Sequence, residues 1–367
     1  MKLLFCIKQL HNAVGGAERV LCTVCSELAA RGHEVTVVSF DPPGSLPFYP
    51  LDARVRRVTL AIGDATRSAG VGETLRRMAF LRRLVLAERP EVAIGFMHSM
   101  FVPLALALIG LGIPVVGSEH IVPEHYRSRP LELALFMLSA PLLGKVTVLS
   151  ETIRDRYPRS IRRRMVAIPN PVIPATCQVG PTGDKPRHTL LSVGRLDAQK
   201  DQATLLRAFS RIFALYPEWD LKIVGEGPLR ERLFAQVEEL GLVDRVALPG
   251  VTHDIAAEYL GADVFVLPSR YEALGLVTVE AMSYGLPVVG FADCPGTNEL
   301  IEDGISGFLV VPGEDRAESL ARALAQLFAD PALRQRLGEA GARTAARMAS
   351  LTSVGDRWAK LLASVGK

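Results

Sequence analysis

Residues 189–200 read Thr-Leu-Leu-Ser-Val-Gly-Arg-Leu-Asp-Ala-Gln-Lys, and this stretch decides how the chain is divided. Its apolar run, 189–193, predicts a buried strand, and an amphipathic pattern that predicts a helix follows over 202–216. Just before it, residues 169–185 contain four prolines and two glycines, the composition of a linker between domains. The chain therefore starts a second domain at this strand.

The same alternation of short apolar runs and amphipathic segments extends through both halves of the chain. Strands are predicted at 2–7, 34–40, 55–60, 92–96, 114–117, 145–149, 165–168, 189–193, 221–224, 246–248, 264–267, 287–289 and 308–310. Helices are predicted at 17–31, 73–88, 101–111, 131–142, 202–216, 229–240, 255–260, 276–283 and 317–328. Such an alternation is typical of βαβ units and a parallel sheet.

The predicted fold is therefore α/β, with two facing Rossmann-like domains, each a doubly wound parallel sheet. We place the first domain at 1–170, the linker at 171–187 and the second domain at 188–348. A tail helix starts at Pro331 with Asp330 as its cap. Residues 349–367 hold a last helix that we expect to return to the first domain, although the sequence alone does not decide this. Such sheets bind ligands beyond the carboxyl ends of their strands, which predicts one cleft between the domains.

Composition excludes several classes of protein. A chain of 367 residues is too long for one typical core, and a net charge of +3 is too small to indicate nucleic-acid binding. Five scattered cysteines argue against a disulfide scaffold and favour a reducing compartment. Cys22 and Cys25 form a C-x-x-C, but they fall in the middle of a predicted helix, so we interpret them as buried helix residues rather than a redox pair.

Two apolar stretches raise the question of a membrane. Residues 1–10 contain Lys8 and lack a small-residue cleavage site, so they predict a first strand rather than a signal peptide. Residues 100–116 are long enough to span a bilayer. Prolines and glycines break that stretch, which favours a buried helix followed by a strand. We expect a cytoplasmic protein.

The pair Gly15-Gly16 follows the first strand and opens a helix. Glycines let the backbone approach a ligand closely, and a helix N-terminus attracts phosphate. The pattern is not the dinucleotide fingerprint G-x-G-x-x-G. A turn that serves backbone geometry alone is an equally open interpretation.

Cations follow the first strand of the second domain. Arg195 and Lys200 would point from that strand end into the cleft, where a forked guanidinium and an ammonium could clamp a diphosphate. They would neutralise a departing nucleoside diphosphate as its charge grows. Two solvated surface cations are the alternative. The next strand ends at Gly-Glu-Gly-Pro, 225–228, where Glu226 would help to frame the nucleotide unless the turn is purely structural.

Two glutamates give the most specific signal. Glu272 lies in a loop after a predicted strand, and Glu280 lies on the helix that follows it. One carboxylate can face the transferred sugar while the other accepts hydrogen bonds from ribose hydroxyls. Leu276, which opens the helix, joins the donor-binding set.

The segment 293–299, Asp-Cys-Pro-Gly-Thr-Asn-Glu, follows another strand. It predicts a turn whose N–H groups lead into a helix start and form an anion site. Gly296, Thr297 and Glu299 are its candidate donor-binding residues, and Glu299 would lie at the edge of the cleft. A bare turn followed by a helix with an acid at its start is the alternative.

Together these positions resemble glycosyltransferase family 4, with its two-domain GT-B fold, over nearly the whole chain. The resemblance implies that Arg195 and Lys200 bind the diphosphate, Glu280 the ribose, and that Glu272 approaches the donor sugar. It implies that 295–299 hold sugar hydroxyls and phosphate, with Gly16 adding a backbone N–H. His98 matches the family histidine near the donor sugar. The chain departs from the family at Leu274-Gly275, where Phe-Gly is common, and at Asn170-Pro171, where Asn-Gly is common.

The resemblance further implies a retaining glycosyltransferase that moves a hexose or N-acetylhexosamine from a nucleoside diphosphate sugar. The sequence does not name the base of that nucleotide, and we predict a UDP-sugar. The leaving phosphate would help to deprotonate the acceptor in a front-face substitution. Because the chain contains no Asp-x-Asp, we expect neither an essential metal nor another cofactor. Closure of the two domains over the donor is expected.

The first domain should bind the acceptor, a lipid-linked glycan or polysaccharide precursor. Residues 75–89 mix apolar side chains with four arginines before Arg89, and such a basic amphipathic helix can lie on an anionic membrane. A second basic run covers 154–164. An ordinary solvated helix face is the alternative. Ser118-Glu119-His120 is similar to a segment of family members that extend lipid-linked oligosaccharides, so Glu119 and His120 either contact the acceptor or simply end a strand.

Other functions fit the same fold. A sugar-nucleotide epimerase would need a different acid–base set, and a phosphorylase would need a pyridoxal-binding lysine and a longer chain. A GDP-mannose-dependent mannosyltransferase differs only in the donor. A non-catalytic sugar-nucleotide-binding module is disfavoured by the presence of Arg195, Lys200, Glu272 and Glu280 together.

Overall fold

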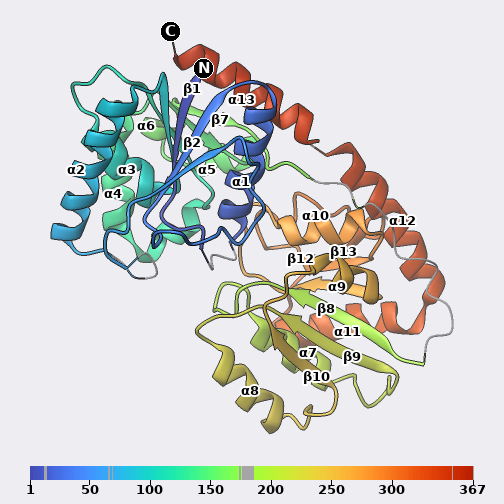
Figure 1. Ribbon diagram of the computed structural model, residues 1–367. Helices are drawn as coiled ribbons and strands as arrows, with labels where there is room; N and C mark the ends of the chain where they lie inside the picture. The colour runs from blue at the N-terminus through green and yellow to red at the C-terminus, as the bar shows by residue number, and fades with distance from the viewer. Residues whose placement is uncertain are drawn as a thin grey trace. The chain divides into compact units, whose positions relative to one another are not determined.

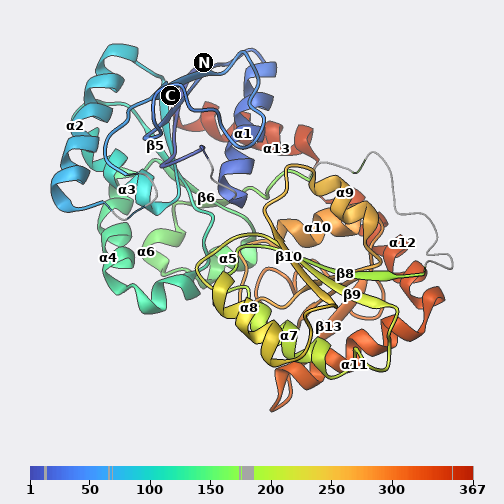
Figure 2. The ribbon, with the colours of Figure 1, turned by 60° about the horizontal axis from the view of Figure 1, so that its bottom comes forward.

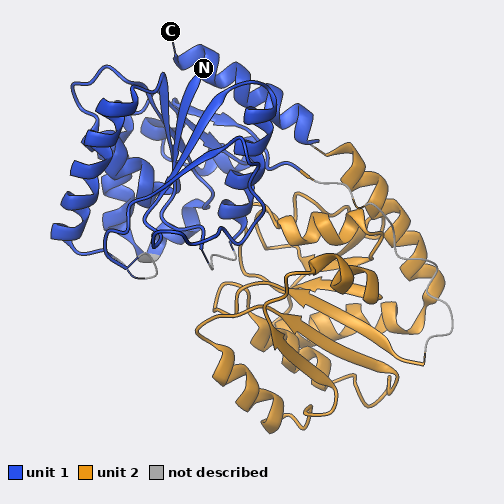
Figure 3. Cartoon of the chain, in the orientation of Figure 1, with its two compact units in different colours: residues 1–171, 349–367 blue, residues 172–348 orange. Residues whose placement is uncertain are grey.

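The computed structural model describes residues 1–11, 15–64, 67, 69–172, 175, 186–348 and 350–366. The chain forms two compact units, shown in Figure 3. Unit 1 consists of Met1–Pro171 and Ala349–Lys367, and unit 2 of Val172–Met348. Each unit is built on one parallel sheet with helices on its faces (Figure 1), so the predicted class of two Rossmann-like α/β domains is confirmed.

The sheet of unit 1 has seven parallel strands in the order β3-β2-β1-β4-β5-β6-β7. Their bounds are β1 Lys2–Cys6, β2 Glu34–Ser39, β3 Arg56–Thr59, β4 Val92–Phe96, β5 Val115–Ser118, β6 Lys145–Val148 and β7 Met165–Ala167. The order runs outward from β1 in both directions, which places a topological switch point between β1 and β4. All five residues of β4 are buried, as expected for a central strand covered on both faces.

The helices of unit 1 include three short ones that the sequence did not predict. The elements are α1 Gly16–Ala30, α2 Val71–Glu88, α3 His98–Ala107, 3₁₀ helix η1 Pro123–Ser128, α4 Pro130–Ser139, 3₁₀ helix η2 Ala140–Leu142, α5 Glu151–Arg156, α6 Arg159–Arg162 and α13 Leu351–Val365. The unpredicted helices are η1, α5 and α6, and they are too short to show a hydrophobic period. The second basic run lies on α5 and α6.

The last helix, α13, packs against α1 within unit 1. Arg31, the C-cap residue of α1, forms an ion pair of 2.6 Å with Asp356 of α13. The indole of Trp358 stacks on Phe96 with 6.2 Å between ring centroids, and it also contacts Phe5. Aromatic packing against the central strands β1 and β4 therefore holds the C-terminal helix in this unit.

The sheet of unit 2 has six parallel strands in the order β10-β9-β8-β11-β12-β13. They are β8 His188–Val193, β9 Trp219–Val224, β10 Val246–Gly250, β11 Val264–Leu267, β12 Val288–Phe291 and β13 Gly307–Val310. Its helices are α7 Gln202–Ser210, α8 Arg230–Glu239, α9 Ile255–Gly261, α10 Leu276–Ser283, α11 Arg316–Ala329 and α12 Pro331–Arg347. The switch point lies between β8 and β11. Asp330 caps α12 by accepting a hydrogen bond from the N–H of Leu333, as predicted.

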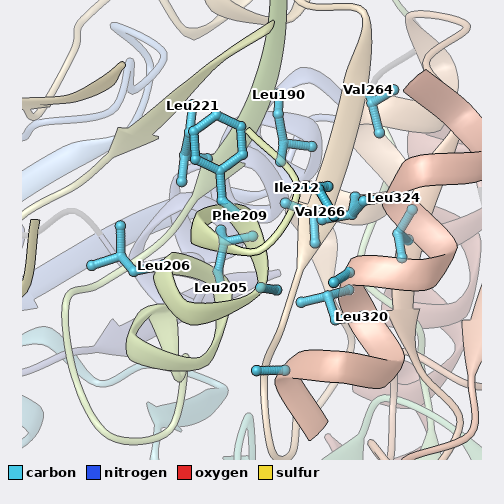
Figure 4. Packing of buried hydrophobic residues seen from close by; sticks show 14 of the residues in the cluster. Leu190, Leu205, Leu206, Phe209, Ile212, Leu221, Val264, Val266, Leu320 and Leu324 are labelled. Carbon is cyan, nitrogen blue, oxygen red and sulfur yellow. The ribbon is translucent and has the colours of Figure 1, made fainter. Parts of the chain in front are cut away.

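Apolar side chains from α7, near the start of unit 2, and from α11, near its end, fill the core of this unit together with the strands. Figure 4 shows residues of α7 and α11 packed with those of β8, β9 and β11. Tyr259 of α9 and Met282 of α10 belong to a second buried cluster. Two apolar layers on one parallel sheet leave its carboxyl edge as the place where polar side chains can gather.

The apolar stretch 100–116 forms α3 and β5, joined by a turn, as predicted. Phe101 lies so close to the sheet that a Cβ at Gly95 would be less than 3.0 Å from its backbone. Among the described residues, no helix is both long and apolar enough to span a membrane. Cys22 and Cys25 are buried on α1, and burial raises the pKa of the Cys22 thiol to about 12, which fits buried helix residues.

Candidate functional site

The loops that follow β8 and β9 pack backbone against backbone at the carboxyl edge of unit 2. A Cβ at Gly225 would lie less than 3.0 Å from the carbonyl oxygen of Gly194. A Cβ at Gly227 would lie equally close to the backbone of Leu196. The N–H of Leu196 donates to the carbonyl of Glu226 at 2.9 Å. Glycine is therefore required in these loops because no side chain fits between them.

The loops after β11 and β12 are joined in the same way. Gly296 has a φ of +80°, and a Cβ there would lie less than 3.0 Å from the carbonyl of Glu272. The N–H of Glu272 donates to the carbonyl of Pro295 at 2.8 Å. The side chain of Gln199 donates to the carbonyl of Tyr271 at 2.9 Å and links this pair of loops to the loop after β8.

Lys200 and Glu272 meet at the centre of these loops. The ammonium Nζ of Lys200 lies 2.7 Å from Oε1 of Glu272, and both side chains are largely buried. Asp197 accepts a hydrogen bond from the backbone N–H of Lys200 at 3.0 Å. Because Gly194 has no side chain, the aliphatic part of Lys200 can pass close to it. A Cβ added at Gly194 would lie 3.2 Å from that chain. The structure thus holds a cation and an acid together at one sheet edge.

The other two predicted charges have partners of their own. The side chain of Arg195 is 69% exposed and donates to Oδ2 of Asp197 at 2.6 Å. Glu280 is buried on α10, and its Oε2 accepts a hydrogen bond from the hydroxyl of Tyr259 at 3.0 Å. Arg195 and Lys200 follow β8, and Glu272 and Glu280 follow the neighbouring strand β11, so all four belong to the same edge of the sheet.

The segment after β12 corrects one prediction. Residues 292–300 form successive turns, and no helix starts within this segment. The side chain of Asn298 donates to the carbonyl of Ala292 at 2.9 Å, a local bond that competes with helical hydrogen bonding. Thr297 is buried, and its hydroxyl lies 3.4 Å from Sγ of Cys294, whereas Glu299 is exposed.

Two further donor-side predictions lie on the rim of the loops. Glu226 is about half exposed and accepts a hydrogen bond of 2.8 Å from Arg230, one helical turn away. Leu276 is the first residue of α10, and its N–H donates to the carbonyl of Leu274 at 2.6 Å.

Sequence reasoning missed two buried hydroxyls, that of Ser269 just after β11 and that of Thr278 in the first turn of α10. Among the described residues, the hydroxyls of Ser269 and Thr278 are buried without a hydrogen-bond partner. A Cβ at Gly275, the residue that caps α10 without a side chain, would lie 3.1 Å from the hydroxyl of Thr278 and 3.5 Å from that of Thr297. Hydroxyls beside an uncapped helix N-terminus can bind an anion, and an unsatisfied buried hydroxyl is costly without one.

His98 of unit 1 starts α3 directly after β4. The preceding residue, Met97, has a φ of +69°, an uncommon backbone conformation for a residue with a side chain. Nε2 of His98 lies 3.1 Å from Oε2 of Glu132, and its Nδ1 lies 3.9 Å from Oε2 of Glu119. Burial lowers the pKa of His98, so the imidazole is held in its neutral form beside an acid. The sequence did not single out Glu132, because the segment around it has no motif.

Glu119 and His120 are held by contacts inside unit 1. The carboxylate of Glu119 accepts hydrogen bonds from the N–H groups of His120 and Ile121 and from the hydroxyl of Tyr126, at 2.9, 3.0 and 2.7 Å. Burial raises the pKa of Glu119 to about 7, against the effect of these three donors. His120 stacks on Phe96 at 5.0 Å, and burial lowers its pKa to about 4. The position of Glu119 therefore depends on its internal partners.

The Gly15-Gly16 pair opens α1 as predicted, with Gly15 as the cap and Gly16 as the first residue. A Cβ at Gly15 would lie less than 3.0 Å from the carboxylate of Glu18, which shows that this acid turns back toward the start of its own helix. Residues 12–14, the remainder of this loop, lie outside the described residues.

The helix over 75–89 was predicted to present its arginines on one basic face, and the structure differs at one of them. Arg77 is buried rather than exposed. It lies 4.3 Å from the ring centre of Phe40, donates to the carbonyl of Ile62, and forms an ion pair of 2.5 Å with Glu73. Arg77 lies on the same side of α2 as Leu81, the side packed on the unit, and therefore cannot contribute to a surface charge.

Within the described residues, no group of three or more histidine, cysteine, aspartate or glutamate side chains is placed to hold a metal ion. The cationic and hydroxyl groups at the loops of unit 2 are those that a phosphate would need. Whether the reaction requires a metal remains a prediction from the sequence.

Comparison with known proteins covers both units. Residues 14–176 match the family described as Glycosyltransferase Family 4, and residues 181–344 match Glycosyl transferases group 1. An uncharacterized glycosyltransferase of Haemophilus influenzae is 28% identical over 90% of this chain and 92% of its own length. The GalNAc-alpha-(1->4)-GalNAc-alpha-(1->3)-diNAcBac-PP-undecaprenol alpha-1,4-N-acetyl-D-galactosaminyltransferase of Campylobacter jejuni is 27% identical over 100% of this chain and 99% of its own.

Among solved structures, Anabaena HepE in complex with UDP and glucose has a TM-score of 0.80 and 21% identity, and the match covers 99% of this chain and 100% of that one. At this identity the likeness shows the fold, two Rossmann-like domains of the GT-B type.

Proposed function

Because the chain belongs to glycosyltransferase family 4 and is a glycosyltransferase, we propose that it transfers a hexose or N-acetylhexosamine from a UDP-sugar to a sugar acceptor. The acceptor we propose is a lipid-linked glycan or another polysaccharide precursor, met at the cytoplasmic face of a membrane. The donor would bind to the loops of unit 2 around Lys200 and Glu272.

The ion pair of Lys200 and Glu272 is the observation that carries this proposal. In the free protein the carboxylate of Glu272 neutralises the ammonium of Lys200 across 2.7 Å. A diphosphate would offer Lys200 a second anionic partner, and Glu272 could then accept hydrogen bonds from the hydroxyls of the attached sugar. The hydroxyls of Ser269 and Thr278 and the N-terminus of α10 supply further donors to phosphate oxygens.

Several residues would contribute around this centre. Arg195 is exposed and paired with Asp197, so a bound diphosphate could attract its guanidinium away from that pair. Glu280, buried beside Tyr259, would hold the ribose. Gly296 and Thr297 would present backbone N–H groups, while Glu226 and Glu299 would contribute from the rim. From unit 1 we assign His98 and the Gly15-Gly16 helix start to the donor, and Glu119 and His120 to the acceptor side.

The choice of donor and acceptor is supported by the relatives. The Campylobacter jejuni protein, which matches along the whole chain, is named for transfer of N-acetylgalactosamine to an undecaprenol-linked glycan. HepE has been solved with UDP and glucose. A GDP-mannose-dependent mannosyltransferase is the alternative, since the residues proposed for the donor would contact its phosphates, ribose and sugar rather than its base.

We further propose that the anomeric configuration is retained. The leaving phosphate would accept the proton of the acceptor hydroxyl as the new bond forms on the same face of the sugar. The protein would then act by positioning the two substrates and by stabilising the diphosphate charge, without an essential metal. A retained product by NMR, and activity that survives EDTA, would support these two points.

Binding of the donor can be tested by thermal shift with a panel of UDP- and GDP-sugars. We expect UDP-sugars to stabilise the protein, and Lys200→Ala to weaken that binding about 10- to 100-fold, because a charge-assisted hydrogen bond contributes about 1.5–3 kcal/mol. Lys222→Ala removes a lysine of the same unit that is paired with Glu258, and it should bind as the natural protein does.

Stabilisation by GDP-mannose alone would favour the alternative donor. Unchanged affinity in Lys200→Ala would place the donor elsewhere and overturn the site.

A further inference from the structure

Helix α4 exposes a continuous stripe of leucines. Leu131 and Leu138 are 71% and 75% exposed, and Leu135 lies between them on the same side of the helix. Leu142 of η2 continues the stripe, because spacings of four, three and four residues return to one helical face. The opposite side is anchored by Phe136 and Ser139, which are buried. The helix is thus apolar on the face that water contacts as well as on the face that packs.

The stripe belongs to a larger apolar surface of unit 1. Of the eighteen large hydrophobic residues exposed among the described residues, eleven lie between positions 71 and 142. Figures 1 and 2 show α2, α3 and α4 along one flank of this unit, and α3 packs against both of its neighbours. We call these exposed residues the apolar flank: Val71, Leu75, Phe80, Leu86, Leu106, Ile109, Leu131, Leu135, Met137, Leu138 and Leu142. A surface of this kind marks an interaction site.

Positive charge borders the apolar flank. Arg76, Arg83 and Arg89 are exposed on or just after α2, and none of them forms an ion pair within the part of the chain that the structure describes. The guanidinium of Arg83 lies 5.8 Å from the ring centre of Phe80, one of the residues of the flank.

The acids nearby are already engaged within unit 1. Glu73 pairs with Arg77, Glu88 with Arg56, and Glu132 with Arg129. The flank therefore presents apolar side chains together with uncompensated cations.

We propose that the apolar flank docks on an anionic lipid bilayer, with the leucines of α4 in the interfacial region and the arginines of α2 on lipid phosphates. A bilayer offers both an apolar interior and a negative surface, which matches the two properties of this flank. A symmetric contact between two copies would bring the same unpaired arginines together and is disfavoured for that reason. The inference rests on the proposed function, since a lipid-linked acceptor requires contact with a membrane.

The flank begins next to the candidate acceptor side. Leu131, the first leucine of the stripe, precedes Glu132, whose carboxylate lies 3.1 Å from His98, and the other ring nitrogen of His98 lies 3.9 Å from the acceptor-side Glu119. A bilayer in contact with Leu131 would therefore lie close to the imidazole of His98. The sugar of a lipid-linked acceptor could then reach this site while its lipid stays in the bilayer. This places the apolar contact on α4, whereas the sequence pattern pointed to α2.

Co-sedimentation of the full chain with vesicles tests the proposal. We expect binding to vesicles of phosphatidylcholine and phosphatidylglycerol and much weaker binding to phosphatidylcholine alone. The triple variant Leu131→Ser, Leu135→Ser, Leu138→Ser should bind the mixed vesicles at least about tenfold more weakly, because it removes the apolar contact. The variant Arg76→Gln, Arg83→Gln should lose the preference for the anionic lipid and the salt dependence of binding.

A matched control changes exposed apolar residues of unit 2. Leu215 and Val243 are exposed to a similar degree, and Leu215→Ser, Val243→Ser should bind vesicles as the natural protein does. Cooperative unfolding followed by the fluorescence of Trp358, which packs on Phe96 inside unit 1, shows whether unit 1 is folded in each of its variants. Stabilisation by a UDP-sugar gives the same check for the variant of unit 2. Equal binding by the folded triple variant, equal binding to both kinds of vesicle, or a dimer that the triple variant dissociates would each overturn the proposal.

The outcome is separable from that of the proposed function. The protein could bind anionic vesicles through α4 and yet transfer sugar only to soluble acceptors. That result would support the docking surface and overturn the lipid-linked acceptor. The triple variant could instead lose vesicle binding while its transfer to a lipid-linked acceptor in detergent stays unchanged. That result would support both the docking surface and the proposed acceptor.

Discussion

The candidate sites of the two units are built in opposite ways. In unit 2, four loops touch through their backbones, and the essential feature is the absence of a side chain at Gly225, Gly227 and Gly296. In unit 1, the cluster around His98 is held by ionisable side chains, with Glu119 and Glu132 on either side of the imidazole. The first site is sensitive to added volume, whereas the second is sensitive to protonation.

This difference follows from what the site of each unit is proposed to bind. A diphosphate is bound well by fixed N–H groups, hydroxyls and cations, so a rigid frame of loops serves it. Sugar hydroxyls both donate and accept hydrogen bonds, and burial of histidines and acids controls which of these groups carries a proton. Variants that add volume to one site and change charge in the other can break or sharpen the comparison.

The largest effect is expected from added volume in unit 2. Gly227→Ala places a methyl group less than 3.0 Å from the backbone of Leu196, so the two loops must separate. We expect transfer activity to fall at least about 100-fold, as for other displacements of about 1 Å, and stability to fall by about 2–3 kcal/mol. Activity assays and urea unfolding measure the two effects.

Gly261→Ala is the matched control for this variant. Gly261 ends α9 in the same unit, and nothing lies within 4 Å of its Cβ position. Its activity should stay within about twofold, since alanine also suits a helix better than glycine does. Similar losses in both variants would show that the loops of unit 2 do not depend on close backbone contact.

The second effect is a pH dependence of unit 1 in which two groups oppose each other. The pKa of Glu119 is raised from 4.5 to about 7, so its contribution to stability is present below pH 4.5 and is lost as the pH rises to 7. The pKa of His120 is lowered from 6.5 to about 4, so its contribution is present above pH 6.5 and is lost as the pH falls to 4. His98, whose pKa burial also lowers, acts in the same sense as His120.

Single variants should separate the two contributions. In Glu119→Gln, where His120 remains, the free energy of unfolding should rise by up to about 3 kcal/mol as the pH goes from 4 to 6.5. In His120→Asn, where Glu119 remains, it should fall by up to about 3 kcal/mol as the pH goes from 4.5 to 7. Trp358 fluorescence in a Trp219→Phe background would report the unfolding of unit 1, because these are the two tryptophans of the chain. The same pH profile in both variants would contradict the assignment.

The smallest effect is expected from Glu132→Gln. This change keeps the shape of the side chain but removes the charge beside Nε2 of His98. We expect kcat/KM to fall about tenfold, which corresponds to a charge-assisted hydrogen bond. The acid limb of the pH profile should move to lower pH, because the histidine loses the carboxylate that favours its protonated form.

Glu124→Gln is the control for this charge change. Glu124 pairs with Arg156 in the same region and lies outside the contacts of His98 described above. Its kcat/KM should change less than about threefold, as for other pairs near a surface. A pH profile that Glu132→Gln leaves unmoved would mean that Glu132 does not position His98.

Some features of the site could not be predicted from local pattern. The expected helix start after Gly296 was wrong, because the side chain of Asn298 bonds back to Ala292 and favours turns. Arg77 fits a basic stripe in the sequence, yet it is buried against Phe40 by a contact between residues far apart in the chain. Glu132 was not singled out, because its relation to His98 exists only when α3 and α4 pack together.

The two parallel α/β units and the glycine-marked loops could be predicted from local sequence, because strand–helix alternation and tight turns depend on residues close together in the chain. The tertiary structure alone decided that Lys200 meets Glu272, that Arg77 is buried, and that the leucines of α4 face outward. Such facts depend on which elements pack side by side, and packing brings together residues whose separation along the chain carries no pattern.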